Sequence, residues 1–265
     1  MDSIPYRRWR GALVVAAGLV LALILAVPAS AETITIVTEE WPPYNYSEDG
    51  VVKGVVTEIV REAMNRTGLE YSIQAMPWSR AYAMAMNTDN VMIYSIFKLP
   101  NREASFQWIP LHGPAVTMYL FKPVHREDIQ IQDLEDAKHY VVGVTRDTST
   151  HHFLLENGFE ENVNLIPLPS EEQNIHMTLP DVERTDLLTG DRLSIAHWLQ
   201  DSGLTMEYLE EIVFLFQEEF YFAFSRNTSP ELVAKVQEAV DEIAADGTME
   251  RIMESYAASL NSGAR

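Results

Sequence analysis

The stretch from Met76 to Trp108, MPWSRAYAMAMNTDNVMIYSIFKLPNREASFQW, holds the clearest succession of structural signals in the chain. It predicts a helix, a short apolar strand, a polar loop and a returning strand. Ser95 ends the apolar strand, and Arg102 follows seven residues later in the loop. Ligands of open α/β sheets bind beyond the carboxyl ends of the strands, so both side chains are expected at a binding site. The planar fork of Arg102 suits a carboxylate, whereas a solvated Arg102 paired with Glu103 is the alternative.

The first 31 residues predict a secretory signal peptide. Three arginines precede an apolar run from Gly11 to Val27, and the segment Pro28–Ala31 has the small residues of a cleavage site. The run is short for a membrane-spanning helix, which needs about 20 residues, so an uncleaved anchor is the less favoured alternative. We expect cleavage after Ala31 and a periplasmic mature chain that begins at Glu32.

Composition excludes several classes of function. The chain carries 39 acidic against 19 basic residues, a formal net charge of −20, and such a surface repels nucleic acid and anionic lipid. It has no cysteine, which excludes a thiolate metal site, a cysteine nucleophile and a lipid anchor on cysteine. We therefore expect neither a metal nor a cofactor, and a protein that is free of the membrane after cleavage.

The loop that follows the first predicted strand concentrates aromatic and acidic side chains. Thr33–Thr38 alternates and is β-branched, which predicts a strand, and EEWPPYNY (residues 39–46) follows with two prolines that stiffen it. We expect at least one aromatic ring of this loop to face a ligand, whereas packing of the rings on the protein body is the alternative. The candidate side chains are Glu39, Glu40, Trp41 and Tyr44.

Apolar periodicity and turn residues predict the other elements. The expected helices cover residues 55–67, 77–86, 151–156, 230–245 and 249–258, with a polar helical piece at 205–210. The expected strands cover residues 70–76, 91–95, 106–109, 116–121, 140–144, 163–167, 193–196, 212–216 and 220–224. A change to polar composition near Lys122 and the acidic break at 217–219 indicate two crossings between domains. The predicted division is residues 1–31 as signal peptide, 32–121 plus 218–265 as the first lobe, and 122–217 as the second.

The segment before the helix at 151–156 is a candidate anion site. Asp147 or Thr148 suits the position that caps the helix, and the free amides of a helix start attract anions. A capped helix without a ligand is the alternative. His151 and His152 are adjacent and point apart on a helix, which argues against a metal pair.

In order and spacing these segments resemble the periplasmic solute-binding proteins of ABC importers, in the amino-acid-binding family 3. The matching segments are TITIVTEEWPPYNYSEDG from Thr33, KGVVTE from Lys53, SIFKLPNREASF from Ser95, VGVTRDTS from Val142 and YFAFSR from Tyr221. The resemblance implies the type II periplasmic-binding-protein fold. In that fold two α/β lobes, each a mixed sheet flanked by helices, are joined by two hinge crossings around a cleft that closes on its ligand.

The resemblance also implies roles for particular residues. Arg102 would bind a ligand α-carboxylate with the hydroxyl of Ser95, and the helix start at Thr148 and Ser149 would add hydroxyls and amides. An aromatic ring, Trp41 or Tyr44, would stack on the ligand.

One departure from the family pattern concerns the α-amino group of the ligand. The family usually places an Asp for it shortly after an L-x-x-G-R-x-D segment, but Ser194 stands at the Asp of that segment and His197–Leu199 where the amine-binding Asp is expected. Glu39 or Glu40 is the substitute we consider, and the departure leaves open whether the ligand is a standard α-amino acid.

The segment PWSRAY (residues 77–82) resembles a divergent branch of the family. Trp78 and Arg80 start the helix in this segment, near the expected cleft. Arg80 is therefore a second candidate for the anionic anchor.

The predicted function is capture of a small polar, carboxylate-bearing, amino-acid-like solute by a monomer that delivers it to an inner-membrane ABC permease. A dehydratase-like enzyme on the same fold is one alternative, although no spacing marks a catalytic set. A ligand-sensing partner of a membrane receptor is the other alternative, and every sequence feature that predicts a transport protein fits it equally.

Export gives the first testable expectation. Mass spectrometry of the soluble exported fraction should find a chain that begins at Glu32, because the cleavage site follows directly on the short apolar run. Recovery of a chain that retains Met1 and sediments with membranes would contradict cleavage.

Overall fold

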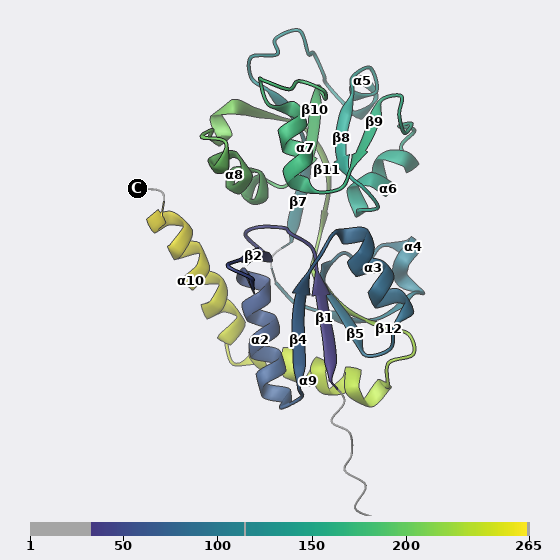
Figure 1. Cartoon of the computed structure of the whole chain (residues 1–265), viewed down its shortest axis with the longest axis vertical. Helices are drawn as coiled ribbons and strands as arrows, with labels where there is room; N and C mark the ends of the chain where they lie inside the picture. Colours follow the sequence, from purple (N-terminus) through teal and green to yellow (C-terminus); the bar gives the residue numbers. More distant parts are fainter. Residues whose placement is uncertain (1–32, 114, 264–265) are drawn as a thin grey trace, which may run out of the picture. The chain divides into compact units, whose positions relative to one another are not determined.

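The computed structural model describes residues Thr33–Gly113 and Ala115–Gly263. The expected signal peptide, residues 1–31, lies outside these residues. The described chain forms two five-stranded sheets and a small two-stranded one (Figure 1), which confirms the two-lobe α/β prediction. Within this part of the chain, no helix has the length and apolar character needed to cross a bilayer.

The first lobe is built on a sheet with the strand order β4-β1-β5-β12-β6. Its strands are β4 (Tyr71–Ala75), β1 (Ile34–Thr38), β5 (Val91–Ile96), β12 (Tyr221–Ser225) and β6 (Phe106–Pro110). The helices of this lobe are α2 (Val55–Thr67), α3 (Trp78–Asn87), α4 (Pro100–Glu103), α9 (Pro230–Ala245) and α10 (Thr248–Gly263). A hairpin of β2 (Tyr46–Glu48) and β3 (Val51–Lys53) lies between β1 and α2 in sequence.

Alternation along β1 explains why helices cover both faces of the first sheet. Ile34 and Ile36 belong to the apolar cluster that contains the buried faces of α2 and α9, whereas Val37 belongs to the cluster of α3. Successive side chains of a strand point to opposite faces, so this apolar run supplies both layers. β1 pairs in parallel with β4 and β5, and the carboxyl ends of β1 and β5 therefore lie at the same edge.

The second lobe is built on a sheet with the strand order β11-β7-β10-β8-β9. Its strands are β11 (Leu209–Glu218), β7 (Val116–Pro123), β10 (Leu187–Gly190), β8 (Val142–Thr145) and β9 (Leu165–Leu168). Its helical elements are α5 (Leu134–Ala137), α6 (Ser149–Glu156), α7 (Glu171–Thr178), α8 (Arg192–Asp201) and the 3₁₀ turn η1 (Met206–Tyr208).

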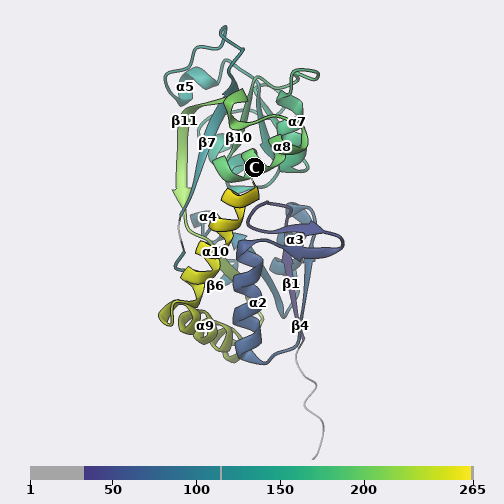
Figure 2. The same ribbon diagram turned by 90° about the vertical axis from the view of Figure 1, so that its left-hand side faces the viewer.

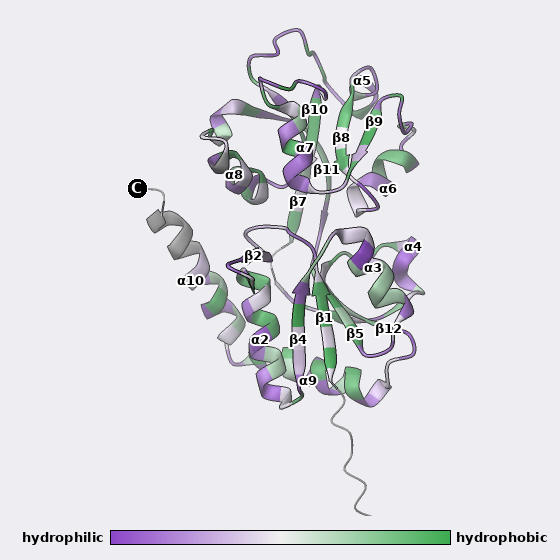
Figure 3. Cartoon of the chain, in the orientation of Figure 1, coloured by the Kyte–Doolittle hydropathy of each residue, from purple (hydrophilic) through white to green (hydrophobic). Residues whose placement is uncertain are grey.

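The strands of the second lobe are strongly apolar because helices and loops cover the sheet. Figure 3 shows β8, β9 and β10 largely in the colour of hydrophobic residues. Phe121 and Leu188 pack with Ile175 of α7 and Ile195 of α8, on one face of the sheet. Continuous apolar runs of this kind are typical of strands that are buried on both faces.

The first crossing between the lobes comes earlier than the sequence predicted. Val116–Pro123 pairs with β10 and β11, so these residues belong to the second sheet, and the chain leaves the first sheet after Pro110. Figure 2 shows β11 beside β7. The change in composition near Lys122 marks the end of β7 rather than the crossing. The chain returns through Glu219 and Phe220, between β11 and β12.

Two short predictions in the second lobe are wrong. Leu193–Ala196 is not a strand but lies in α8, because the side chain of Asp191 caps that helix by accepting from the amides of Leu193 and Ser194. In the expected helical piece at 205–210, only the three residues of η1 are helical, and β11 already begins at Leu209. An apolar run of four residues does not distinguish a strand from one turn of a buried helix.

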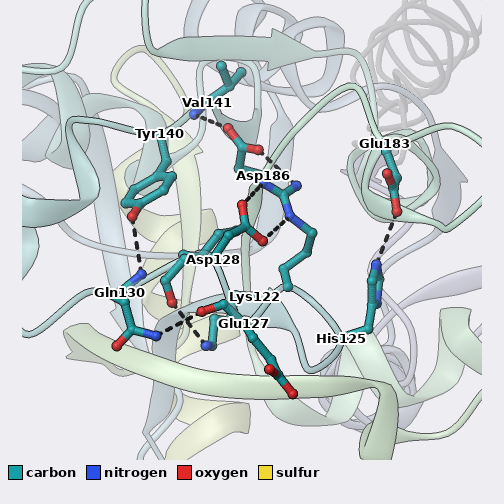
Figure 4. A network of polar contacts seen from close by, with 11 residues as sticks. Lys122, His125, Glu127, Asp128, Gln130, Tyr140, Val141, Glu183 and Asp186 are labelled. Atoms are coloured by element: carbon teal, nitrogen blue, oxygen red, sulfur yellow. Dashed lines mark hydrogen bonds and ion pairs between the residues drawn. The ribbon is translucent and has the colours of Figure 1, made fainter.

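The polar run after β7 is fixed by charged contacts (Figure 4). Arg126 donates to Asp128 at 2.9 and 2.8 Å and pairs with Asp186 at 3.0 Å. The other oxygen of Asp186 accepts from the amide of Val141 at 2.9 Å, just before β8. This network holds the loop against the sheet, and it does not contribute to the site described below.

Gly54 couples the aromatic loop to α2. It adopts φ 115° and ψ 160°, a region that is essentially restricted to glycine, and a Cβ there would collide with the backbone of Tyr44. The amide of Val56 donates to the carbonyl of Tyr44 at 3.0 Å, and that of Val55 to Pro43 at 3.1 Å. The close approach therefore sets the position of the loop that carries Trp41 and Tyr44.

Replacement of Gly54 should be costly. Gly54→Ala should lower the free energy of unfolding by at least about 2 kcal/mol, because backbone strain of about 1–3 kcal/mol adds to overpacking of similar size. Denaturant unfolding followed by circular dichroism measures it. Gly50→Ala is the matched control: its φ is 76° but nothing lies within 4 Å of an added Cβ, so a loss of about 1 kcal/mol is expected. Equal losses in the two variants would contradict the steric argument.

Candidate functional site

A cavity of about 50 Å³ lies where the strand ends of the two lobes meet. First-lobe residues come from the ends of β1 and β5 and from the start of α3. Second-lobe residues come from β7, from the ends of β8 and β10, and from the starts of α6 and α7. The lining residues are Glu39, Trp41, Trp78, Ser95, Phe97, Met118, Thr145, Thr148, Ser149, Thr150, Glu171 and Thr189.

Ser95 combines backbone strain with an unsatisfied polar atom. It lies near the end of β5 with φ 56°, which is uncommon for a residue other than glycine. Its Oγ is buried and has no hydrogen-bond partner among the residues that the structure describes. Strained residues cluster at ligand sites, and a buried unpaired hydroxyl that lines a cavity is available to a ligand.

Arg102 is a buried cation beside this cavity rather than a solvated loop charge. The short helix α4 carries it, and its guanidinium lies 5.2 Å from the ring centres of both Trp78 and Tyr82. It donates to Ser149 Oγ at 3.1 Å and to the carbonyl of Asp147 at 2.9 Å, both in the second lobe. Burial lowers the pKa of Arg102, although arginine stays charged in proteins. The expected alternative of an exposed pair with Glu103 is wrong: Glu103 pairs with Lys98 at 3.0 Å.

Asp147 receives several first-lobe donors. Besides Arg102, the indole N–H of Trp78 donates to its carbonyl at 2.8 Å, and the hydroxyl of Ser79 donates to its carboxylate at 2.9 Å. Asp147 has φ 61°, and its own amide donates to Nδ1 of His151 at 3.1 Å. This turn between β8 and α6 is therefore one contact between the lobes.

The start of α6 supplies hydroxyls to the cavity. Thr148 caps the helix through its Oγ1, which accepts from the amide of His151 at 3.3 Å and donates to the carbonyl of Thr145 at 2.7 Å. Ser149 and Thr150 follow in the first turn, and both are buried. Amides and hydroxyls at a helix start form an environment that favours an anionic group.

Asp191 forms another contact between the lobes. It follows β10 directly, is only 3% exposed, and caps α8. Trp41 Nε1 donates to its Oδ2 at 2.9 Å and the hydroxyl of Tyr44 to its Oδ1 at 3.0 Å. The sequence lacks the expected Asp at Ser194 and at residues 197–199. The structure nevertheless places a buried carboxylate in this part of the second lobe, at Asp191, three residues before Ser194.

Glu171 brings a second carboxyl group of the second lobe into the cavity lining. It is the first residue of α7, and its Oε2 accepts from the hydroxyl of Ser194 and from Trp198 Nε1 at 3.3 Å. Its Oε1 lies over Gly190, where an added Cβ would be 3.3 Å away.

The carboxyl groups of the site resist ionisation. Burial raises the pKa of Glu39 to about 8; Arg102 opposes this shift and Glu40 adds to it. Burial also raises the pKa of Glu171, and the neighbouring Asp191 raises it further. Burial raises the pKa of Asp191, against the opposing effect of its hydrogen bonds. Like charges in a low-dielectric site disfavour one another, so the cavity holds protons near neutral pH.

The structure brings together most, but not all, of the residues that the sequence singled out. The predicted residues that line the cavity are Glu39, Trp41, Trp78, Ser95, Thr148 and Ser149. Arg102 touches this lining through Ser149, and Tyr44 contacts Asp191. Two candidates lie elsewhere: Glu40 accepts from the amide of Ser47 at 2.7 Å, and Arg80 is exposed on α3. Arg80 fails as a lining residue because α3 presents Trp78 to the cavity and Arg80 to solvent.

The sequence analysis missed Glu171 and Asp191. Asp191 follows an apolar strand directly and caps a helix, in LLTGDR, and Glu171 is the first helical residue three positions after an apolar strand, in LIPLPSEE. A strand end followed by a helix start was therefore the available signal. In the described part of the chain, no group of three or more His, Asp or Glu residues is arranged to hold a metal.

Known proteins agree with this architecture. Two α/β lobes with a cavity at the facing strand ends are the architecture of periplasmic binding proteins, and the fold is the type II fold of the solved structures described below. The sequence pattern of the bacterial extracellular solute-binding proteins, family 3, matches residues 34–259, and the chain belongs to this family. No curated protein matches the sequence.

Solved structures share the fold at low sequence identity. An ancestral arginine-binding protein bound to arginine has a TM-score of 0.72 at 16% identity, with coverage of 85% of this chain and 98% of that one. The arginine-, lysine-, histidine-binding protein ArtJ from Geobacillus stearothermophilus has a TM-score of 0.71 at 18% identity, with coverage of 84% and 94%. A histidine kinase sensor domain similar to periplasmic binding proteins has a TM-score of 0.74 at 18% identity, with coverage of 84% and 95%.

The raised pKa of Glu39 predicts a pH-dependent stability. The folded protein keeps a proton on Glu39 between its ordinary pKa of 4.5 and about 8, whereas the unfolded chain has lost it. The stabilising contribution is therefore complete below about pH 4.5 and is lost as the pH rises through about 8.

Denaturant unfolding between pH 5 and 8.5 should show this loss in the wild type and a shallower decline in Glu39→Gln. Glu40→Gln is the matched control, because Glu40 is the next residue of the same loop but lies outside the cavity lining. It should keep most of the wild-type slope, since Glu40 is the smallest of the causes that shift the pKa of Glu39. Equal slopes for wild type and Glu39→Gln would contradict the assignment.

Proposed function

We propose that this protein is a periplasmic solute-binding protein that captures a small amino-acid-like solute and presents it to an inner-membrane ABC importer. The observation that carries the proposal is the buried, unpaired hydroxyl of Ser95 in a cavity between the lobes, close to the buried cation Arg102. A polar atom in this state lacks a partner that a bound solute can supply. No chemical step is part of the proposal.

Both signs of charge at the site suit a zwitterionic solute. The guanidinium of Arg102, with Ser149, Thr148 and the first amides of α6, would receive a carboxylate. The carboxyl groups of Glu39 and Asp191, whose ionisation burial disfavours, would accept hydrogen bonds from an ammonium group, and its positive charge would favour their ionised form. Trp41 and Trp78 contribute aromatic surface to the lining.

The size of the cavity supports a capture mechanism in which the lobes separate and close. Pockets for small molecules usually measure roughly 300–1,000 Å³, and the cavity between the lobes measures about 50 Å³. A solute would enter after the contacts at Asp147 and Asp191 part, and its own contacts to both lobes would then favour closure. An importer that recognises the closed arrangement would sense occupancy.

The solved relatives support the class of solute. Two of those described above are named as binding arginine, or arginine, lysine and histidine, and another is named as a putative L-cystine ABC transporter from Listeria monocytogenes. The kinase sensor domain favours a second candidate, a soluble partner that reports solute capture to a membrane receptor. Affinity capture with the loaded protein as bait distinguishes the two, because an importer permease or a receptor would be retained.

Native mass spectrometry of the purified protein tests the proposal directly. A retained small molecule with the mass of an amino acid or a close derivative is the expected result, and calorimetric titration then gives its affinity. A protein that retains no solute, and that binds no member of an amino-acid panel, would contradict the proposal.

Arg102 should dominate the affinity for the carboxylate. Arg102→Ala should weaken binding of the retained solute by roughly 30-fold to several thousand-fold, because losing one partner of a buried charge pair costs about 2–5 kcal/mol. Arg102→Lys keeps the charge but loses the fork, so partial recovery is expected. Calorimetric titration measures both.

Arg80→Ala is the matched control, since Arg80 is an exposed arginine on the adjacent helix and its loss should leave affinity nearly unchanged. Wild-type affinity in Arg102→Ala would remove Arg102 from the site. A large loss confined to Arg80→Ala would move the anchor to the start of α3.

A further inference from the structure

Glu171 lines the cavity, although capture of a simple zwitterion does not require its carboxyl group. Arg102 offers a positive charge, and Glu39 in the first lobe and Asp191 in the second each offer a carboxyl group that an ammonium group would help to ionise. Glu171 adds a further carboxyl group, and it belongs to the cavity lining itself. It is only 8% exposed, which is unusual for a glutamate.

The surroundings of Glu171 fix the position of its carboxyl group in the cavity lining. The hydroxyl of Ser194 and the indole N–H of Trp198 both donate to Oε2, and they hold one side of the group against α8. Oε1 packs over Gly190, where the absence of a side chain leaves room for it. A carboxyl group held in this way by its neighbours is preorganised to receive a donor from within the cavity.

The charges that face Glu171 are negative. Asp191 approaches from the start of α8 and Glu39 from the loop after β1, and both disfavour ionisation of Glu171. The cation Arg102 acts on Glu39 and donates to Asp147 and Ser149 in the second lobe. A carboxylate in such a place is costly unless it is neutralised by a proton or by a cation.

We propose, building on the capture function above, that Glu171 is a specificity-determining residue that selects a solute carrying a cationic group in addition to its α-ammonium. The positive charge of the bound solute takes the place of a proton on the Glu171 carboxyl group. On binding, the carboxylic O–H bond breaks, the proton leaves to solvent, and the carboxylate accepts hydrogen bonds from the cationic group. The solute class is a basic amino acid.

Matched pairs of solutes test the inference by calorimetric titration. Arginine and citrulline have nearly the same shape and differ in the charge of the terminal group, so the wild type should prefer arginine by roughly 10- to 100-fold, the range of one charge-assisted hydrogen bond. Lysine against glutamine is the second pair. Glu171→Gln should bring arginine and citrulline within about threefold of each other, whereas Glu171→Asp, which keeps the charge, should retain a preference for arginine.

Glu172→Gln is the matched control on the same turn of α7, because Glu172 is exposed and lies outside the cavity lining. It should preserve the wild-type preference. Circular dichroism of each variant shows whether it is folded before titration.

Proton release gives a second readout that a purely structural role would not change. Titration of arginine in two buffers with different ionisation enthalpies should show protons leaving the wild type on binding, and affinity should rise between pH 5.5 and 8. Glu171→Gln should release fewer protons and have a flatter pH profile.

Equal affinity of the wild type for arginine and citrulline, or an arginine preference that survives Glu171→Gln, would overturn the inference while amino-acid capture stands. Failure to bind any amino acid of the panel, charged or neutral, would overturn the proposed function and this inference together.

Discussion

The buried carboxylate of Asp191 needs hydrogen-bond donors, and this need is the constraint on which the arrangement of the two lobes depends. Its oxygens accept from two amides of its own helix, those of Leu193 at 3.0 Å and Ser194 at 3.2 Å. They also accept from Trp41 and Tyr44 of the other lobe, at 2.9 and 3.0 Å. The amides set the direction of the carboxylate, and because a buried carboxylate without partners is costly, the aromatic donors must reach it.

This constraint reaches back into the first lobe through the aromatic loop. Trp41 and Tyr44 stand on a segment whose carbonyls accept from the first amides of α2, and the close approach requires a glycine at position 54. Their rings also pack against Phe220, at the return crossing. The same residues therefore serve the core of the first lobe, the hinge region and the contact with Asp191.

The hydrogen-bonded contacts between the lobes at Asp147 and at Asp191 differ in kind. At Asp147 the first lobe donates mainly to a backbone carbonyl, through Trp78 and Arg102, and at Asp191 it donates to a carboxylate. Backbone carbonyls tolerate changes in pH, whereas a carboxylate that gains a proton loses acceptor strength. On the proposed function, proton binding and solute binding would therefore compete on the carboxyl side of the site, whereas the charge of Arg102 does not change over the physiological pH range.

Local sequence was sufficient for most of the strands, for the longer helices and for several of the residues at strand ends. Apolar alternation predicted β1 and β5, helical spacing predicted α2 and α9, and the spacing between Ser95 and Arg102 placed both beside the cavity. These features depend on near neighbours in the chain, since periodicity and capping act over a few residues. The tertiary structure decided which charged groups meet: Trp41 and Asp191 are 150 residues apart, and Glu171 and Ser194 are 23 apart. No local pattern encodes such pairings, and the protonation of Glu39, Glu171 and Asp191 depends on burial and on one another, which exist only once both lobes have folded.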